Sequence, residues 1–166
     1  KLIHSELRLI RLRAAAPVQA ALVPAPAATM MPALDWLRFA ERFRGPEDLV
    51  REHQRRYLPR FHGAANILDI GCGRGEFLEV ARNAGLDALG IDAHPEFIEL
   101  CRGKGLAAEQ ADMFAYLVAL PNDSLGGVFC SHVVEHIDAA RLPVLIQLLG
   151  QKLRPGAPAV FETPNA

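Results

Sequence analysis

The sequence predicts a doubly wound α/β domain, in which a mainly parallel sheet carries helices on both faces. Two observations support this prediction. After Gly63, short apolar runs of strand length alternate with longer runs of helical period, which builds βαβ units with right-handed crossovers. The first apolar run also ends in a glycine-rich turn that leads into a helix, the place where such folds bind nucleotide-like ligands.

The elements follow in order along the chain. The expected strands span residues 66–70, 87–91, 106–110, 126–130 and 158–163. The expected helices between them span residues 75–84, 95–103, 113–120 and 139–152. Because ligands of such sheets lie outside the carboxyl ends of the strands, we expect the chemistry just after residues 70, 91, 110 and 130.

The chain before the first strand divides into two parts. Residues 1–32 combine a short amphipathic helix with an Ala/Pro-rich linker, whose composition is typical of an extended spacer. Residues 33–62 predict two helices, broken at Gly45-Pro46, that form a helical cap on the core domain of residues 63–166. Lys1 is not an initiator Met and no secretion signal follows it, so we expect a piece of a longer protein.

Composition excludes several classes of protein. The 18 Lys and Arg residues are balanced by 19 Asp and Glu residues, for a net charge of -1, so no basic field predicts binding to nucleic acid. The apolar stretches are too short for a transmembrane segment. Cys72, Cys101 and Cys130 are odd in number and widely spaced, which fits neither a disulfide framework nor a zinc site and indicates a reducing, cytoplasmic compartment.

The glycine-rich turn spans residues 69–76 and reads DIGCGRGE. Its glycines let the backbone approach a ligand, and the amides at the start of the next helix face it. A dinucleotide fingerprint would require a third glycine at position 76, where Glu76 stands, and the carboxylate of Asp69 would repel a pyrophosphate. The turn therefore favours a cationic ligand such as S-adenosylmethionine over the cofactor of an NAD-dependent oxidoreductase, which is the alternative.

The segment ILDIGCGRGEFL resembles the D/ExGxGxG motif of the class I S-adenosylmethionine-dependent methyltransferases. Asp92 ends the second strand 21 residues after Gly71, and this position favours hydrogen bonds to the ribose hydroxyls; a helix cap before Pro95 is the alternative. The resemblance implies that Asp112 and Met113 contact the adenine, although Asp112 also fits a helix cap. The residues expected to bind the donor are Asp69, Gly71, Cys72, Gly73, Asp92, Ala93, Asp112, Met113, Cys130 and His132.

The segment SHVVEH after the fourth strand places His132, Glu135 and His136 at a spacing that predicts one shared helical face. The same string is typical of some zinc peptidases, but its place after a parallel strand resembles the acceptor edge of methyltransferases, and we expect no metal. The ubiquinone-pathway O-methyltransferases, which the segment also resembles, have a metal-associated acidic residue where His132 stands. We predict that His136, or His132, takes a proton from an acceptor hydroxyl; a structural brace is the alternative.

The order of these motifs, with RFRG at residues 42–45, resembles methyltransferases of bacterial surface-polysaccharide and lipopolysaccharide biosynthesis over residues 39–165. Some of these are fused to glycosyltransferases. The resemblance implies an acceptor that is a sugar or cell-envelope precursor, S-adenosylhomocysteine as product, and a cap arginine that binds the donor carboxylate. It also implies that a helix and an antiparallel pair of strands of the family follow residue 166. A donor-binding regulatory domain without catalysis is the alternative.

Overall fold

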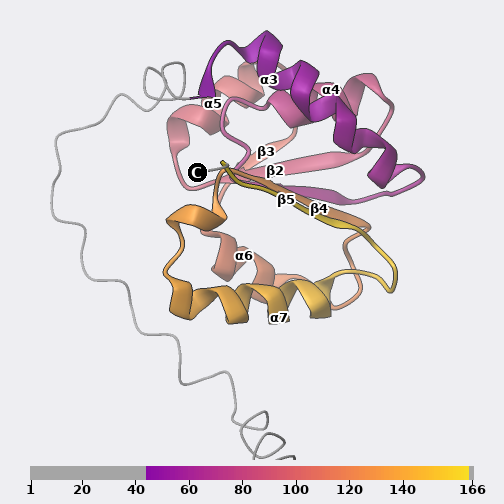
Figure 1. Cartoon of the computed structure of the whole chain (residues 1–166), viewed down its shortest axis with the longest axis vertical. Helices are drawn as coiled ribbons and strands as arrows, with labels where there is room; N and C mark the ends of the chain where they lie inside the picture. Colours follow the sequence, from indigo (N-terminus) through magenta and orange to yellow (C-terminus); the bar gives the residue numbers. More distant parts are fainter. Residues whose placement is uncertain (1–43, 165–166) are drawn as a thin grey trace, which may run out of the picture. The chain divides into compact units, whose positions relative to one another are not determined.

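The structure is a computed structural model that describes residues 44–164. The predicted N-terminal helix and linker, residues 1–32, lie outside the described residues, as does most of the first cap helix. Figure 1 shows the described elements around one sheet. No helix of this part of the chain is long and apolar enough to cross a membrane.

Five parallel strands form the sheet, in the order β3-β2-β1-β4-β5. The strands are β1 (Ile67–Ile70), β2 (Ala88–Asp92), β3 (Ala108–Gln110), β4 (Gly127–Ser131) and β5 (Ala159–Glu162). The chain builds outward from β1 to β3, then returns to place β4 on the other side of β1. This confirms the predicted doubly wound fold and places the switch in strand order between β1 and β4, where such folds bind ligands.

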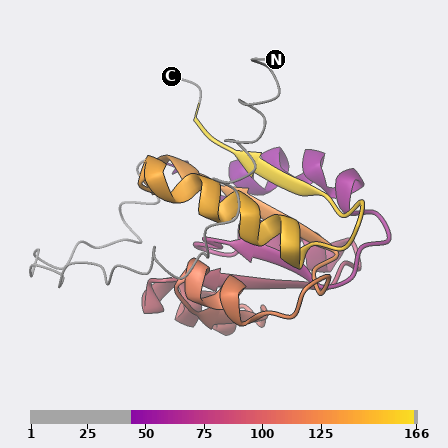
Figure 2. The ribbon, with the colours of Figure 1, turned by 90° about the horizontal axis from the view of Figure 1, so that it is seen from below.

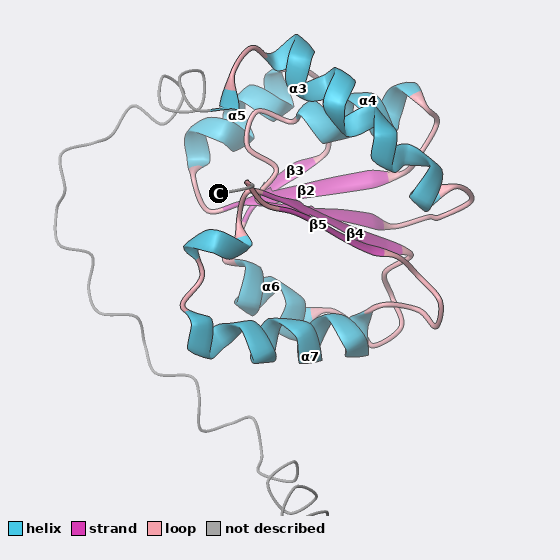
Figure 3. Ribbon diagram, viewed as in Figure 1, coloured by secondary structure: helices cyan, strands magenta, loops and turns pink. Residues whose placement is uncertain are grey.

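Helices cover both faces of this sheet, as Figure 3 shows. One face carries α3 (Glu47–Gln54), the 3-10 helix η2 (Arg55–Phe61), α4 (Glu76–Asn83) and α5 (Pro95–Gly103). The other carries α6 (Met113–Ala119) and α7 (Leu142–Lys152), which lie side by side in front of the sheet in Figure 2. The helix α7 begins three residues later than predicted, because Ala139–Arg141 form a 3-10 turn capped by the side chain of Asp138.

The core fixes β1 and β4 at the centre of the fold. Every residue of both strands is buried, as expected for parallel strands covered on two faces. On the α4 face, the rings of Phe77 and Phe129 stack with centroids 3.9 Å apart, and Phe61 of η2 packs edge-on against both. Phe61 is fully buried, so the cap that it ends is anchored directly to the sheet.

Candidate functional site

The glycine-rich turn leaves β1 in a conformation that few residues other than glycine adopt. Gly71, Gly73 and Gly75 have φ of +70°, +52° and +83°. A Cβ on Gly71 would lie 2.3 Å from Val133 Cγ2, so the turn packs closely against the segment after β4. At Gly73 the described atom that a Cβ would meet is Nη1 of Arg44, at 2.8 Å. The turn is therefore a tightly packed backbone cradle with the cap arginine lying across it.

Asp69 lies beneath this cradle and is 2% exposed. Burial, together with the nearby charges of Glu76 and Asp92, raises the pKa of its carboxyl to about 8. The positive charge of Arg44 acts in the opposite direction. A buried acid next to a cradle of this kind favours a cationic ligand, since a bound cation stabilises the carboxylate form.

Asp92 ties the end of β2 to the glycine-rich turn. Its Oδ2 accepts a hydrogen bond of 3.1 Å from the amide of Gly73, and its Oδ1 accepts one of 2.9 Å from the amide of His94. The residue that caps α5 is His94, and no side-chain cap is present there. The alternative of Asp92 as the helix cap is therefore wrong. Its role toward a ribose stays a prediction.

The expected adenine side lies at the ends of β2 and β3. The carbonyl of Ala93 accepts a hydrogen bond of 3.1 Å from Gln110 Nε2, which joins the two strand ends. Asp112 caps α6, because its Oδ1 accepts a hydrogen bond of 2.9 Å from the amide of Ala115. Met113 is half-buried and packs against the core. These residues follow the carboxyl ends of β2 and β3, and the cradle follows the carboxyl end of β1, so all lie at the same end of the parallel sheet.

Two cysteines of the predicted donor site are buried. Cys130 at the end of β4 is inaccessible, and burial raises the pKa of its thiol to about 12. A hydrogen bond with Cys101, together with burial, raises the pKa of the Cys72 thiol. Both thiols therefore stay protonated and act through their size and main chain, not as nucleophiles.

The segment after β4 differs from the sequence prediction. The amide of His132 donates to the carbonyl of Glu162 at 2.8 Å, so sheet pairing continues through His132, whose φ is +56°. A single 3-10 turn, Val134–His136, follows. The prediction of one helical face for His132, Glu135 and His136 is therefore wrong, although His132 Nδ1 and Glu135 Oε1 lie 3.5 Å apart. His136 is exposed.

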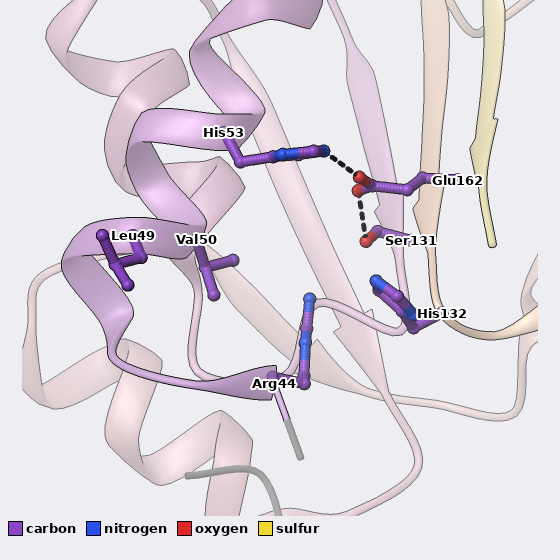
Figure 4. A pocket seen from close by; sticks show the side chains of 7 residues that line it. All are labelled: Arg44, Leu49, Val50, His53, Ser131, His132 and Glu162. Atoms are coloured by element: carbon purple, nitrogen blue, oxygen red, sulfur yellow. Dashed lines mark hydrogen bonds and ion pairs between the residues drawn. The ribbon is translucent and has the colours of Figure 1, made fainter. Parts of the chain in front are cut away.

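A cavity of about 220 Å³ lies between the cap and the ends of β4 and β5 (Figure 4). Its lining residues are Arg44, Leu49, Val50, His53, Ser131, His132 and Glu162. His132 therefore faces a space that a small acceptor group could enter, and His136 is not one of the lining residues. Among the described residues, no group of three or more His, Cys, Asp or Glu side chains is arranged to hold a metal ion.

Glu162 is the functional candidate that sequence reasoning missed. Its Oε2 accepts a hydrogen bond of 2.8 Å from Ser131, and its Oε1 accepts one of 3.3 Å from Tyr57. His53 Nε2 lies 2.5 Å from Oε1, and Figure 4 shows the carboxylate between His53 and Ser131. Arg56 Nη2 contacts the other ring nitrogen of His53 at 2.6 Å, which assigns the donated proton to Nε2. The feature of the sequence that could have indicated Glu162 is its position at the end of a predicted strand.

Comparison with known proteins shows the family to which the chain belongs. The profile of a family described as "Methyltransferase domain" matches residues 38–166. The chain belongs to this methyltransferase family. S-adenosylmethionine is the cofactor of such domains, as in the solved relatives described below.

Relatives of this methyltransferase domain are known in sequence and in structure. A ubiquinone biosynthesis O-methyltransferase of Methylococcus capsulatus is 34% identical over 107 residues, which cover 59% of this chain and 43% of the relative. A SAM-dependent methyltransferase from Archaeoglobus fulgidus is 42% identical, with a TM-score of 0.70 over 72% of this chain and 54% of that one. One from Mesorhizobium loti is 29% identical, with a TM-score of 0.59 over 71% and 55%. The chain spans less than half the length of the curated relative.

The residues of the methyltransferase site fit S-adenosylmethionine. The Arg44 Nε atom is buried and has no hydrogen-bond partner among the described residues, so a cation lies over the cradle with donor capacity unused. Asp69 of β1 supplies a buried acid next to the same turn. The methionine portion of S-adenosylmethionine has a carboxylate that suits the cation of Arg44 and positive charges that suit the acid of Asp69. A pyrophosphate would instead be repelled by the negative charge of Asp69.

Proposed function

We propose that this chain is an S-adenosylmethionine-dependent O-methyltransferase whose acceptor enters the cavity between the cap and the ends of β4 and β5. One observation carries the proposal. Arg44 lies against Gly73 of the donor cradle and also lines the cavity, so the two sites share a wall. A methyl donor and an acceptor hydroxyl can then meet at the end of β4, beside His132.

The chain holds the donor through residues at four strand ends. We assign the methionine portion to the cradle residues Asp69, Gly71, Cys72 and Gly73, with Arg44 as partner of its carboxylate. We assign the ribose to Asp92 and the adjacent Ala93, and the adenine to Asp112 and Met113. The main chain of Cys130 is also assigned to the methionine portion, and His132 lines the side that faces the acceptor. When bound, S-adenosylmethionine supplies an electrophilic methyl group.

The protein accelerates such a transfer mainly by holding the acceptor oxygen in line, an effect that supplies ~7–11 kcal/mol in well-aligned systems. His132 is the proposed base because it lines the cavity and an imidazole nitrogen can accept a proton from an acceptor hydroxyl. Glu162 is proposed to accept a hydrogen bond from the acceptor. A carboxylate has roughly four lone-pair sites, two on each oxygen. Tyr57 and His53 use both sites on Oε1, and Ser131 uses one on Oε2, so one site on Oε2 stays available. His136 is the second candidate for the base.

Two acceptor classes compete for the cavity. The motif order supports a sugar or cell-envelope polysaccharide precursor, in association with a glycosyltransferase. The curated relatives are named for ubiquinone biosynthesis, which supports a precursor with an apolar body. Leu49, 67% exposed, and Val50 give the cavity an apolar side that suits the second class.

The experiment that tests this function follows a tritium-labelled methyl group. The protein is incubated with labelled S-adenosylmethionine and either catechol or a mixture of hexoses, and the labelled product is separated. Transfer to catechol, an aromatic diol, supports the acceptor class with an apolar body, and transfer to a hexose supports the sugar class. A chain that binds the donor but transfers to no acceptor in an extract of bacterial small molecules would be a donor-binding regulatory domain instead.

A further inference from the structure

A buried ion pair joins Arg74 of the glycine-rich turn to Glu76 at the start of α4. Nε and Nη2 of Arg74 each lie 2.7 Å from Glu76 Oε1, and the two side chains are 3% and 1% exposed. Apolar side chains of similar size would often stabilise a core equally well or better. The pair is therefore better explained by the geometry that it imposes than by stability.

Arg74 also reaches out of the turn to the cap. Its Nη2 donates to the carbonyl of Gly45 at 3.0 Å, while its own carbonyl accepts a hydrogen bond of 2.9 Å from Lys104 Nζ. Lys104 Nζ lies 2.7 Å from Oε2 of Glu47, the first residue of α3. Both the side chain and the main chain of Arg74 thus hold the start of α3.

The residue next to this attachment is Arg44. Gly45 has φ of +80°, so the chain turns sharply between Arg44 and α3. The guanidinium of Arg44 lies against Gly73. It also lines the cavity, as Figure 4 shows. Because Arg44 and Gly45 are adjacent in the chain, a shift of the Gly45 carbonyl would move Arg44 off the cradle.

We propose that Arg74 and Glu76 are positioning residues for the methyl donor. Glu76 orients the guanidinium of Arg74, Arg74 fixes Gly45, and Gly45 places Arg44 where it binds the carboxylate of the donor. This inference rests on the proposed function, since it takes Arg44 as a donor-binding residue. The side chains of Arg74 and Glu76 are only 3% and 1% exposed, so their effect on the donor passes through Arg44.

Two ligands separate positioning from a general structural role. S-adenosylhomocysteine carries the amino acid carboxylate, whereas 5′-methylthioadenosine has the same adenosine and sulfur without it. Calorimetry gives the dissociation constant of each ligand for the wild type, Arg44→Ala, the double variant Arg74→Met/Glu76→Leu, and the triple variant. The double variant removes both charges together, so it leaves no unpaired charge in the core. Lys152→Met on α7, which removes another buried cation, is the matched control.

We expect the double variant to bind S-adenosylhomocysteine about tenfold or more weakly, as for the loss of one charged hydrogen bond. Its affinity for 5′-methylthioadenosine stays within about twofold, and the triple variant is no worse than Arg44→Ala. Equal losses for both ligands, or an unchanged affinity for S-adenosylhomocysteine, would overturn the inference. If the double variant does not fold, Arg74→Lys keeps the pair with Glu76 but lacks the fork that reaches Gly45, and the same expectations apply. A wild type that binds neither ligand contradicts the proposed function itself.

Discussion

The amide of Gly73 donates a hydrogen bond of 3.1 Å to Asp92 Oδ2, so the donor cradle after β1 is tied to the strand end expected to hold the ribose. The other oxygen of the same carboxylate accepts from the amide of His94. Asp92 therefore shapes the cradle in addition to its proposed contact with the ligand.

The first prediction concerns this carboxylate. Asp92→Ala weakens binding of S-adenosylhomocysteine by ~1.5–3 kcal/mol for each charged hydrogen bond that is lost. Cys72→Ala, in the same turn, has a smaller effect because Cys72 contributes a buried, protonated thiol. Isothermal calorimetry on the three proteins measures the difference. Equal affinities for the wild type and Asp92→Ala would place the ribose elsewhere.

The second prediction concerns the stability of the fold as a function of pH. Burial raises the pKa of Asp69 from 3.8 to about 8, so between these values the folded state keeps a proton that the unfolded chain has lost. The unfolding free energy therefore falls as pH rises through this window, by up to ~1.4 kcal/mol per pH unit, and levels off above it. Urea unfolding at several pH values from 5 to 9 measures the slope. Asp69→Asn reduces this slope; an unchanged slope in the variant would assign it to other groups.

The third prediction concerns the environment of Glu162. Burial and the charge of Glu162 both raise the pKa of Tyr57. Glu162→Gln removes the charge but keeps the volume, so the pKa of Tyr57 falls while burial still holds it above the ordinary value. The absorbance of the phenolate reports this titration, and Tyr116 is the other tyrosine of the chain. Glu109→Gln is the control, because Glu109 raises the pKa of Tyr116 instead.

The fourth prediction compares the two histidines after β4. His132→Asn lowers the rate of methyl transfer by about 10²-fold or more, the usual contribution of a positioned base, while donor affinity stays within a few-fold. Asparagine tolerates the positive φ at this position. His136→Asn is the matched control and has the smaller effect, because His136 is exposed and does not line the cavity. The reverse order of effects would make His136 the base.

Most of the fold follows from local signals in the sequence. Apolar runs and turn residues placed all five strands, and Pro95 with the apolar spacing after it gave the bounds of α5 as they are found. The helix prediction for residues 132–136 was wrong because the sheet extends to His132 through a long-range hydrogen bond. The amide of His132 donates this bond to the carbonyl of Glu162.

The cavity was harder to predict because its residues are distant in sequence. Glu162 meets Tyr57 and His53 only once the cap is folded over the end of β5. The sequence indicated an arginine of the cap as a donor contact but could not choose one. The structure favours Arg44 among the described residues, because a side chain on Gly73 would contact its guanidinium.

The most direct test of the account is a calorimetric titration of the wild-type chain with S-adenosylhomocysteine and, separately, with NAD. We expect saturable binding of one S-adenosylhomocysteine per chain and no binding of NAD. At a ligand concentration ~100 times the dissociation constant, S-adenosylhomocysteine should also stabilise the fold by about 2.7 kcal/mol. Binding of NAD with no binding of S-adenosylhomocysteine would contradict the assignment of the cradle to the methyl donor.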